Sequence, residues 1–91
     1  MYYLYCLESL KNHKLYIGFT TDLKKRFVDH NNGDGGNFTS HNRPWKLIYY
    51  EAYCEKKDAQ SAEEYYKTGQ GRGILRKKLQ NYFRRGIVPP V

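Results

Sequence analysis

The residues most able to do chemistry lie in the stretch 15–30, LYIGFTTDLKKRFVDH. A short apolar run leads there through a threonine-rich bend into a segment with helical spacing. Four side chains of that segment share one helix face, at positions i, i+3, i+4 and i+7: Leu23, Arg26, Phe27 and His30. Leucine and phenylalanine suit a core, whereas a buried charge without a partner is costly. We therefore expect Arg26 and His30 to point from the edge of the core toward an anion beside Tyr16.

The composition indicates one basic domain. The chain has 91 residues, of which 40% are hydrophobic, and 16 Lys and Arg outnumber nine Asp and Glu for a net charge of +7. A chain of this length builds one core, so we expect a single domain over residues 1–85 and a short tail, 86–91. The charge favours a polyanionic partner, most often nucleic acid. A solvated basic surface kept for solubility is the alternative.

The sequence favours a cytoplasmic protein. No window approaches the roughly 18 consecutive apolar residues of a membrane span. The start, MYYLYCLESL, lacks the basic residues and small-residue cleavage site of a signal peptide. Cys6 and Cys54 are too few for a disulfide framework or a zinc site. We expect both cysteines to be reduced.

Aromatic and aliphatic runs predict three strands, at 2–8, 15–19 and 45–53. The short polar link between the first two runs is typical of a hairpin. With the helices below, the predicted order is strand, strand, helix, strand, helix, helix. This order predicts an α+β domain in which a three-stranded antiparallel sheet is flanked by helices.

The first predicted helix begins after Thr20 or Thr21 as N-cap and continues to about Asn31. The glycine-rich stretch that follows opens the longest irregular segment, 32–44. Loops of this length in a compact domain are often functional. Three of its side chains are suited to phosphate, namely Thr39, His41 and Arg43. A passive connector is equally compatible with the pattern.

The second predicted helix is capped by Asp58 and ends at Gly69. On it, Glu63 occupies the face that also carries Ala59, Ala62 and Tyr66. The stretch TGQGRG at 68–73 is expected to be a tight link. A last, strongly basic helix follows and is broken by Gly86.

Five residues are poorly explained by packing alone: Tyr5, Tyr16, Arg26, His30 and Glu63. Their order and spacing resemble the GIY-YIG nuclease family. Residues 3–5, YLY, resemble the first motif of that family, and residues 16–18, YIG, match the second. The metal-binding glutamate of the family matches Glu63, within A-x-x-x-E-x-x-x-K. The resemblance covers residues 2–85.

The chain also departs from the family pattern. Tyr3 and Leu4 stand where the first motif has glycine and isoleucine. Some family nucleases use an asparagine downstream of the glutamate, and Asn81 is too poorly spaced to be assigned that role. Additional DNA-recognition segments have no counterpart here.

The resemblance implies a metal-dependent endonuclease that hydrolyses DNA. It also implies structure-selective cleavage in repair or recombination as a role, with RNA as an alternative substrate. It implies that Glu63 holds one Mg²⁺ or Mn²⁺ and that Arg26 stabilises the charged phosphorane. Tyr16 is the usual general base, with Tyr5 hydrogen-bonded nearby. Ionising an unperturbed tyrosine at pH 7 costs about 4 kcal/mol, so the base is either Tyr16 or His30.

Seven polar side chains are candidates for nucleic-acid binding: Lys25, Thr39, His41, Arg43, Arg72, Arg76 and Lys77. Each candidate of the site also has a structural explanation on its own. Glu63, for example, can pair with Lys67 at i+4. The alternative function is therefore a non-catalytic nucleic-acid-binding protein that uses the same basic surface.

Overall fold

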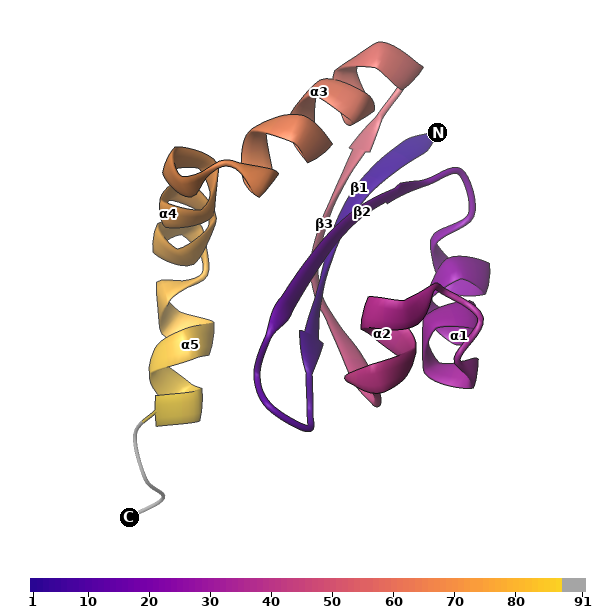
Figure 1. Ribbon diagram of the computed structural model, residues 1–91. Coiled ribbons are helices and arrows are strands. Elements are labelled where there is room, and N and C mark those ends of the chain that lie inside the picture. Colours follow the sequence, from indigo (N-terminus) through magenta and orange to yellow (C-terminus); the bar gives the residue numbers. More distant parts are fainter. Residues whose placement is uncertain (88–91) are drawn as a thin grey trace.

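The computed structural model describes the backbone of residues 1–87 and the side chains of residues 1–84 (Figure 1). It contains a three-stranded antiparallel sheet and helices on both sides of it, which confirms the predicted α+β class. The elements run in the order β1 (Tyr2–Ser9), β2 (Leu15–Thr20), α1 (Leu23–Asn32), α2 (Asn37–His41), β3 (Trp45–Tyr53), α3 (Lys56–Lys67), α4 (Gly69–Lys78) and α5 (Gln80–Ile87). Within residues 1–87, no helix is long and apolar enough to cross a membrane.

Strand β1 lies at the centre of the sheet, in the order β2-β1-β3. Successive β1 side chains point to opposite faces, so the sheet has two cores. Leu4 and Cys6 pack with side chains of α3 and α4, whereas Tyr5 and Leu7 pack with Trp45 and side chains of α1. Figure 1 shows the same division, with α1 and α2 on one side of the sheet and α3 to α5 on the other.

The N-cap of α1 is Asp22, and the prediction of Thr20 or Thr21 is wrong. The Asp22 carboxylate accepts the Lys25 N–H at 3.0 Å, while the Thr20 hydroxyl oxygen accepts the Asp22 N–H at 3.1 Å. Thr20 therefore shapes the turn before the helix rather than the helix end. Gly33, with φ 87°, ends α1 in the left-handed region.

The second and third predicted helices need correction as well. The N-cap of helix α3 is Glu55, three residues before the predicted Asp58, so Asp58 lies inside its first turn. The predicted link 68–73 is instead the start of α4, because the Thr68 hydroxyl oxygen caps that helix by accepting the Gly71 N–H at 3.0 Å. A β-carbon on Gly71 would lie 1.8 Å from the Tyr65 carbonyl oxygen, so only glycine permits this close approach.

The predicted last helix is two helices, since α4 ends at Lys78 with Leu79 as its C-cap and α5 follows. Gly86 does not break α5, which continues to Ile87. Of the predicted tail 86–91, residues 88–91 lie outside the described residues. The predicted loop 32–44 contains the short helix α2.

Candidate active site

Strand β1 and helix α1 bring Tyr5 and His30 together inside the fold. Their side chains are 1% and 0% exposed, and the phenol oxygen shares a 2.7 Å hydrogen bond with His30 Nε2. The Tyr16 ring completes the cluster, with its centroid 4.9 Å from the His30 ring and 6.2 Å from the Tyr5 ring. Tyr16 is only half-buried. Of the three rings, it is the one that reaches the surface.

A side chain at the end of α1 fixes the helix against β3. The Asn31 amide nitrogen donates to the Trp45 carbonyl at 3.1 Å, and the Trp45 N–H donates to the Asn31 amide oxygen at 2.6 Å. The Trp45 indole N–H donates to the Thr39 carbonyl at 2.8 Å. These bonds hold the last turn of α1, and therefore His30, over the sheet.

Gly18 explains why the strand motif YIG has a glycine. Gly18 lies directly opposite Tyr5 in the β1–β2 register. A β-carbon at Gly18 would lie 2.4 Å from the Tyr5 phenol oxygen, well inside van der Waals contact. The absent side chain leaves the space through which the Tyr5 phenol reaches His30.

Burial strengthens the preference of both members of the pair for the neutral form. Burial, with the neighbouring Tyr16, raises the pKa of Tyr5 to about 12, although the hydrogen bond and charge of Arg26 act in the opposite direction. Burial and the charge of Arg26 lower the pKa of His30 to about 4. Tyr5 is therefore a phenol and His30 a neutral imidazole.

Gly35 is a site residue that the sequence analysis missed. A β-carbon there would lie 2.1 Å from His30 Nδ1 and 2.7 Å from the Thr39 hydroxyl oxygen. His30 Nδ1 is buried and has no hydrogen-bond partner within the part of the chain that the structure describes. The glycine-rich run after α1 was the available signal, but it predicts only a chain reversal.

The charges of Arg26 and Glu63 both act on Tyr5. Arg26 is half-buried, and no described carboxylate lies within ion-pair distance of it. Glu63, in α3, pairs with Lys67 at 2.9 Å, and its charge also acts on Tyr5. Glu63 is half-buried whereas Glu64 is exposed, in agreement with the predicted phase of this helix.

The predicted nucleic-acid contacts do not form one cluster. Lys25 pairs with Asp29 at 3.0 Å, and His41 Nδ1–H donates to the Asn37 carbonyl. Arg43 lies against Gly33 at the end of α1. The exposed basic side chains on α4 include three of the predicted set, Arg72, Arg76 and Lys77.

Thr39 contradicts the expectation that it meets phosphate. It is 1% exposed, and its hydroxyl donates to the Gly36 carbonyl at 3.4 Å. Its β-branched side chain packs in the interior beside His30, so it supports the site from within.

The residues fit a water-rich divalent ion rather than a zinc site. Within residues 1–84, no group of three or more His, Cys, Asp or Glu side chains is placed to hold a metal. The Glu63 carboxylate offers hard oxygen atoms, and 24% of its side chain is exposed. Mg²⁺ and Mn²⁺ accept a single carboxylate and complete their shells with water and phosphate oxygens.

Comparison with known proteins identifies the family. The GIY-YIG catalytic domain matches residues 1–80. The chain belongs to the GIY-YIG family. The match spans every residue of the cluster around Tyr5 together with Arg26 and Glu63, and confirms the resemblance seen in the sequence.

The relatives of this GIY-YIG protein are small proteins as well. It is 44% identical over 70 residues to the UPF0213 proteins SpyM3_1077 and SpyM50708 of Streptococcus pyogenes, serotypes M3 and M5, which covers 77% of this chain and 75% of each relative. It also resembles the solution NMR structure of the UPF0213 protein BH0048 from Bacillus halodurans, with a TM-score of 0.53 and 30% identity. That similarity covers 85% of this chain and 84% of the other.

Proposed function

We propose that this protein is a metal-dependent endonuclease that hydrolyses DNA phosphodiester bonds. Its preferred substrates would be branched, damaged or single-stranded DNA of repair or recombination. One observation carries the proposal: Tyr5, Tyr16 and His30 converge where the charge of Arg26 acts on Tyr5 and His30, and this cation has no acidic partner among the described residues. A charge that the fold leaves uncompensated is available to a ligand.

Arg26 is the residue proposed to stabilise the transition state. Phosphodiester hydrolysis adds a water oxygen to phosphorus, places extra negative charge on the phosphoryl oxygens and releases one ester oxygen, which takes up a proton. A fixed guanidinium next to the developing charge lowers this barrier. Its half-buried position strengthens the interaction, because less solvent screens it.

Tyr16 is the proposed contact of the attacking water, because Tyr5 and His30 are fully buried and bonded to each other. A histidine with a pKa of about 4 is a weak base. Tyr16 would accept the proton of the water while its own phenol proton passes to solvent, to which its half-buried ring is open. In this scheme, the buried Tyr5–His30 pair packs against the Tyr16 ring and holds it in position.

The carboxylate of Glu63 would hold Mg²⁺ or Mn²⁺ near Tyr5 and Arg26. When bound, such an ion neutralises phosphate charge and lowers the pKa of a coordinated water. Release of Lys67 from its 2.9 Å ion pair would free the carboxylate oxygen for this role.

A plasmid-nicking assay tests the proposal. With Mg²⁺ or Mn²⁺, the protein should convert supercoiled plasmid to the open circle, and EDTA should prevent the conversion. A panel of duplex, single-stranded, flap and junction oligonucleotides then ranks the substrates. Binding of these oligonucleotides without cleavage, in either metal, would support the alternative of a non-catalytic nucleic-acid-binding protein.

A further inference from the structure

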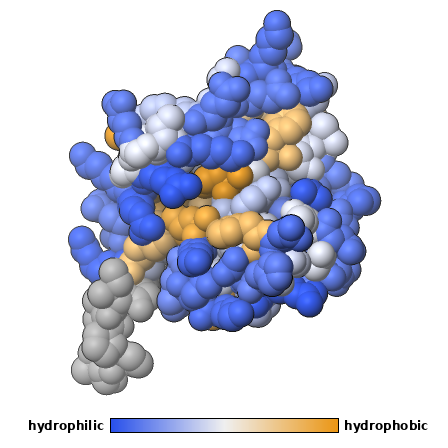
Figure 2. All heavy atoms as spheres, viewed as in Figure 1, coloured by the Kyte–Doolittle hydropathy of each residue, from blue (hydrophilic) through white to orange (hydrophobic). Residues whose placement is uncertain are grey.

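A groove of about 430 Å³ lies at the outer edge of β2, where α4 faces the sheet. Its lining comes from three elements and the residue before β2: Lys14, Leu15, Ile17, Phe38, Arg72, Leu75 and Arg76. Figure 2 shows apolar surface in the region between α4 and the sheet, surrounded by hydrophilic surface. None of the residues assigned to the chemistry lines this groove.

The charges of the groove are all positive. Lys14, Arg72 and Arg76 line it, and no carboxylate does. Within the described part of the chain, none of these three cations is in an ion pair. The groove is therefore complementary to a phosphate.

The apolar floor of the groove indicates a ligand that has an apolar part as well as a phosphate. Leu15, Ile17 and Leu75 are apolar, and the Phe38 ring beside them is 45% exposed. A phosphate gains nothing from apolar surface, whereas a nucleobase has a flat face that stacks on exposed aromatic rings. Cations next to an aromatic ring and an apolar floor thus fit a whole nucleotide, with its phosphate at the rim and its base on the floor.

The groove continues into the proposed active site through Phe38. The Phe38 ring stacks on Tyr16, with centroids 6.2 Å apart and an interplanar angle of 25°. Tyr16 lies between Leu15 and Ile17 in the edge strand, so its side chain points to the opposite face of the sheet. A strand that fills both places must pass around the outer edge of β2.

We propose that this groove is a nucleotide-binding subsite, which seats the base of a DNA nucleotide adjacent to the scissile phosphate on Phe38. The proposal rests on the proposed nuclease function for the position of the scissile phosphate, but the binding itself does not require cleavage. A base can enter the groove only when it is free of its partner strand. The subsite therefore binds an unpaired nucleotide and leaves a fully paired one outside.

The test uses binding by the Glu63→Gln variant, which is expected not to cut the probe. Two duplexes that differ at a single position are compared by fluorescence. One carries an unpaired 2-aminopurine nucleotide at that position, and the other is fully paired. We expect about tenfold tighter binding to the unpaired probe, with quenching of 2-aminopurine, because stacking on one aromatic ring is worth this much or more. Adding Phe38→Ala should reduce the preference to nearly one.

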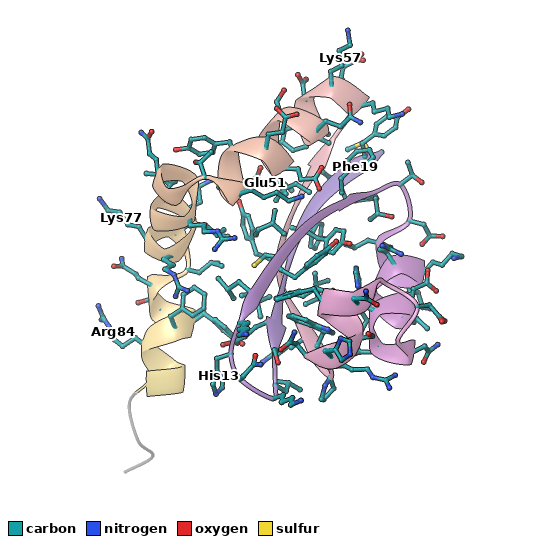
Figure 3. The ribbon with its side chains drawn as sticks, viewed as in Figure 1. His13, Phe19, Glu51, Lys57, Lys77 and Arg84 are labelled. Carbon is teal, nitrogen blue, oxygen red and sulfur yellow. The ribbon has the colours of Figure 1, made fainter. Side chains whose placement is uncertain are left out.

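Two further variants separate base stacking from structural damage and from charge. Phe38→Trp keeps an aromatic ring and should restore the preference. Lys77 points away from the sheet (Figure 3), so Lys77→Ala should weaken both probes equally, whereas Arg76→Ala should weaken the unpaired probe more. An undiminished preference in Phe38→Ala, or no quenching in the parent, overturns the subsite. Absence of plasmid nicking by the wild-type protein, with the preference intact in the Glu63→Gln background, refutes the nuclease proposal and leaves nucleotide binding in the groove standing.

Discussion

Both faces of the sheet bury tyrosine phenols beside an ionisable group, but only on one face is that buried group compensated. On the α3 and α4 side, the Glu51 carboxylate accepts hydrogen bonds from three phenols, those of Tyr49, Tyr53 and Tyr66, two of them at 2.5 and 2.6 Å. Lys78 Nζ lies 3.3 Å from the same carboxylate. Glu51 lies between α3 and the sheet (Figure 3).

The pKa of Glu51 reflects this compensation. Burial acts to raise the pKa of this carboxyl, but the hydrogen bonds from the three phenols and from Lys78 outweigh it and hold the pKa below its usual range. A carboxylate that is already satisfied has little to offer a ligand. We interpret the Glu51 cluster as structural, tying β3 to α3 and α4.

The opposite face leaves its groups incomplete. His30 Nδ1 has no described partner, Arg26 has no described counter-ion, and Tyr16 keeps part of its ring at the surface. Buried unsatisfied polar groups cost stability, so their presence calls for an explanation such as a functional role. The difference teaches that the proposed catalytic cluster is distinguished by what its residues lack inside the fold, since tyrosines are abundant on both faces.

Acid should destabilise the protein through His30. Because the folded pKa of about 4 lies below the ordinary 6.5, this histidine contributes stability above pH 6.5 that is lost as the pH falls toward 4. The loss amounts to about 3 kcal/mol at 1.4 kcal/mol for each pKa unit. The measurement is urea unfolding at several pH values, with His30→Gln beside the wild type. The His30→Gln variant should lose this part of the pH dependence, while the exposed His41→Gln control should keep it. If the free energy of unfolding changed equally with pH in the wild type and both variants, the burial argument would be contradicted.

Removing the uncompensated cation should strongly reduce cleavage. Arg26→Ala is expected to lower the cleavage rate about a hundredfold or more, the usual cost of losing a group that stabilises transition-state charge. DNA affinity should change much less. The exposed neighbour Lys24→Ala is the matched control, with a small effect on both. Parallel losses of rate and affinity would make Arg26 a binding residue instead.

Much of this arrangement could be predicted from the sequence, because it depends on local spacing. Aromatic and aliphatic runs predicted the strands, and the 3.6-residue period predicted Arg26 and His30 on the inner face of α1. The N-caps of α1 and α3 were predicted wrongly because several neighbouring polar residues are able to cap, and the choice depends on how the preceding chain turns. Gly35 and the buried position of Thr39 could not be predicted, since their distances to His30 come from tertiary packing.

A side chain at position 18 should disturb the Tyr5–His30 pair. Gly18→Ala places a methyl group where the Tyr5 phenol lies, so the 2.7 Å bond to His30 must break or shift. We expect about a tenfold loss of cleavage, and circular dichroism should show that the fold is retained. The control is Gly73→Ala in α4, where a β-carbon meets nothing within 4 Å. It should be neutral or slightly stabilising, because alanine favours helix. Full activity of Gly18→Ala would show that the Tyr5–His30 bond is dispensable.

Substitution in the Glu51 cluster should change the stability of the protein and not its activity. Glu51→Gln removes the charge that Lys78 and the phenols satisfy, and should lower the free energy of unfolding by about 1–2 kcal/mol. Cleavage per folded molecule should change less than twofold. Exposed Glu55→Gln provides a control for loss of one negative charge. A large loss of cleavage at unchanged stability would move the functional site to this face.

The most direct test of the account compares Glu63→Gln with Glu64→Gln, two adjacent glutamates of α3 that differ in burial. Cleavage of the best substrate and binding of Mn²⁺ and DNA are measured for both variants and the wild type. The account predicts that Glu63→Gln abolishes cleavage and weakens Mn²⁺ binding while DNA affinity stays nearly unchanged, and that Glu64→Gln behaves as wild type. Normal cleavage by Glu63→Gln, or a loss confined to Glu64→Gln, would contradict the proposed metal site and the catalytic assignment that depends on it.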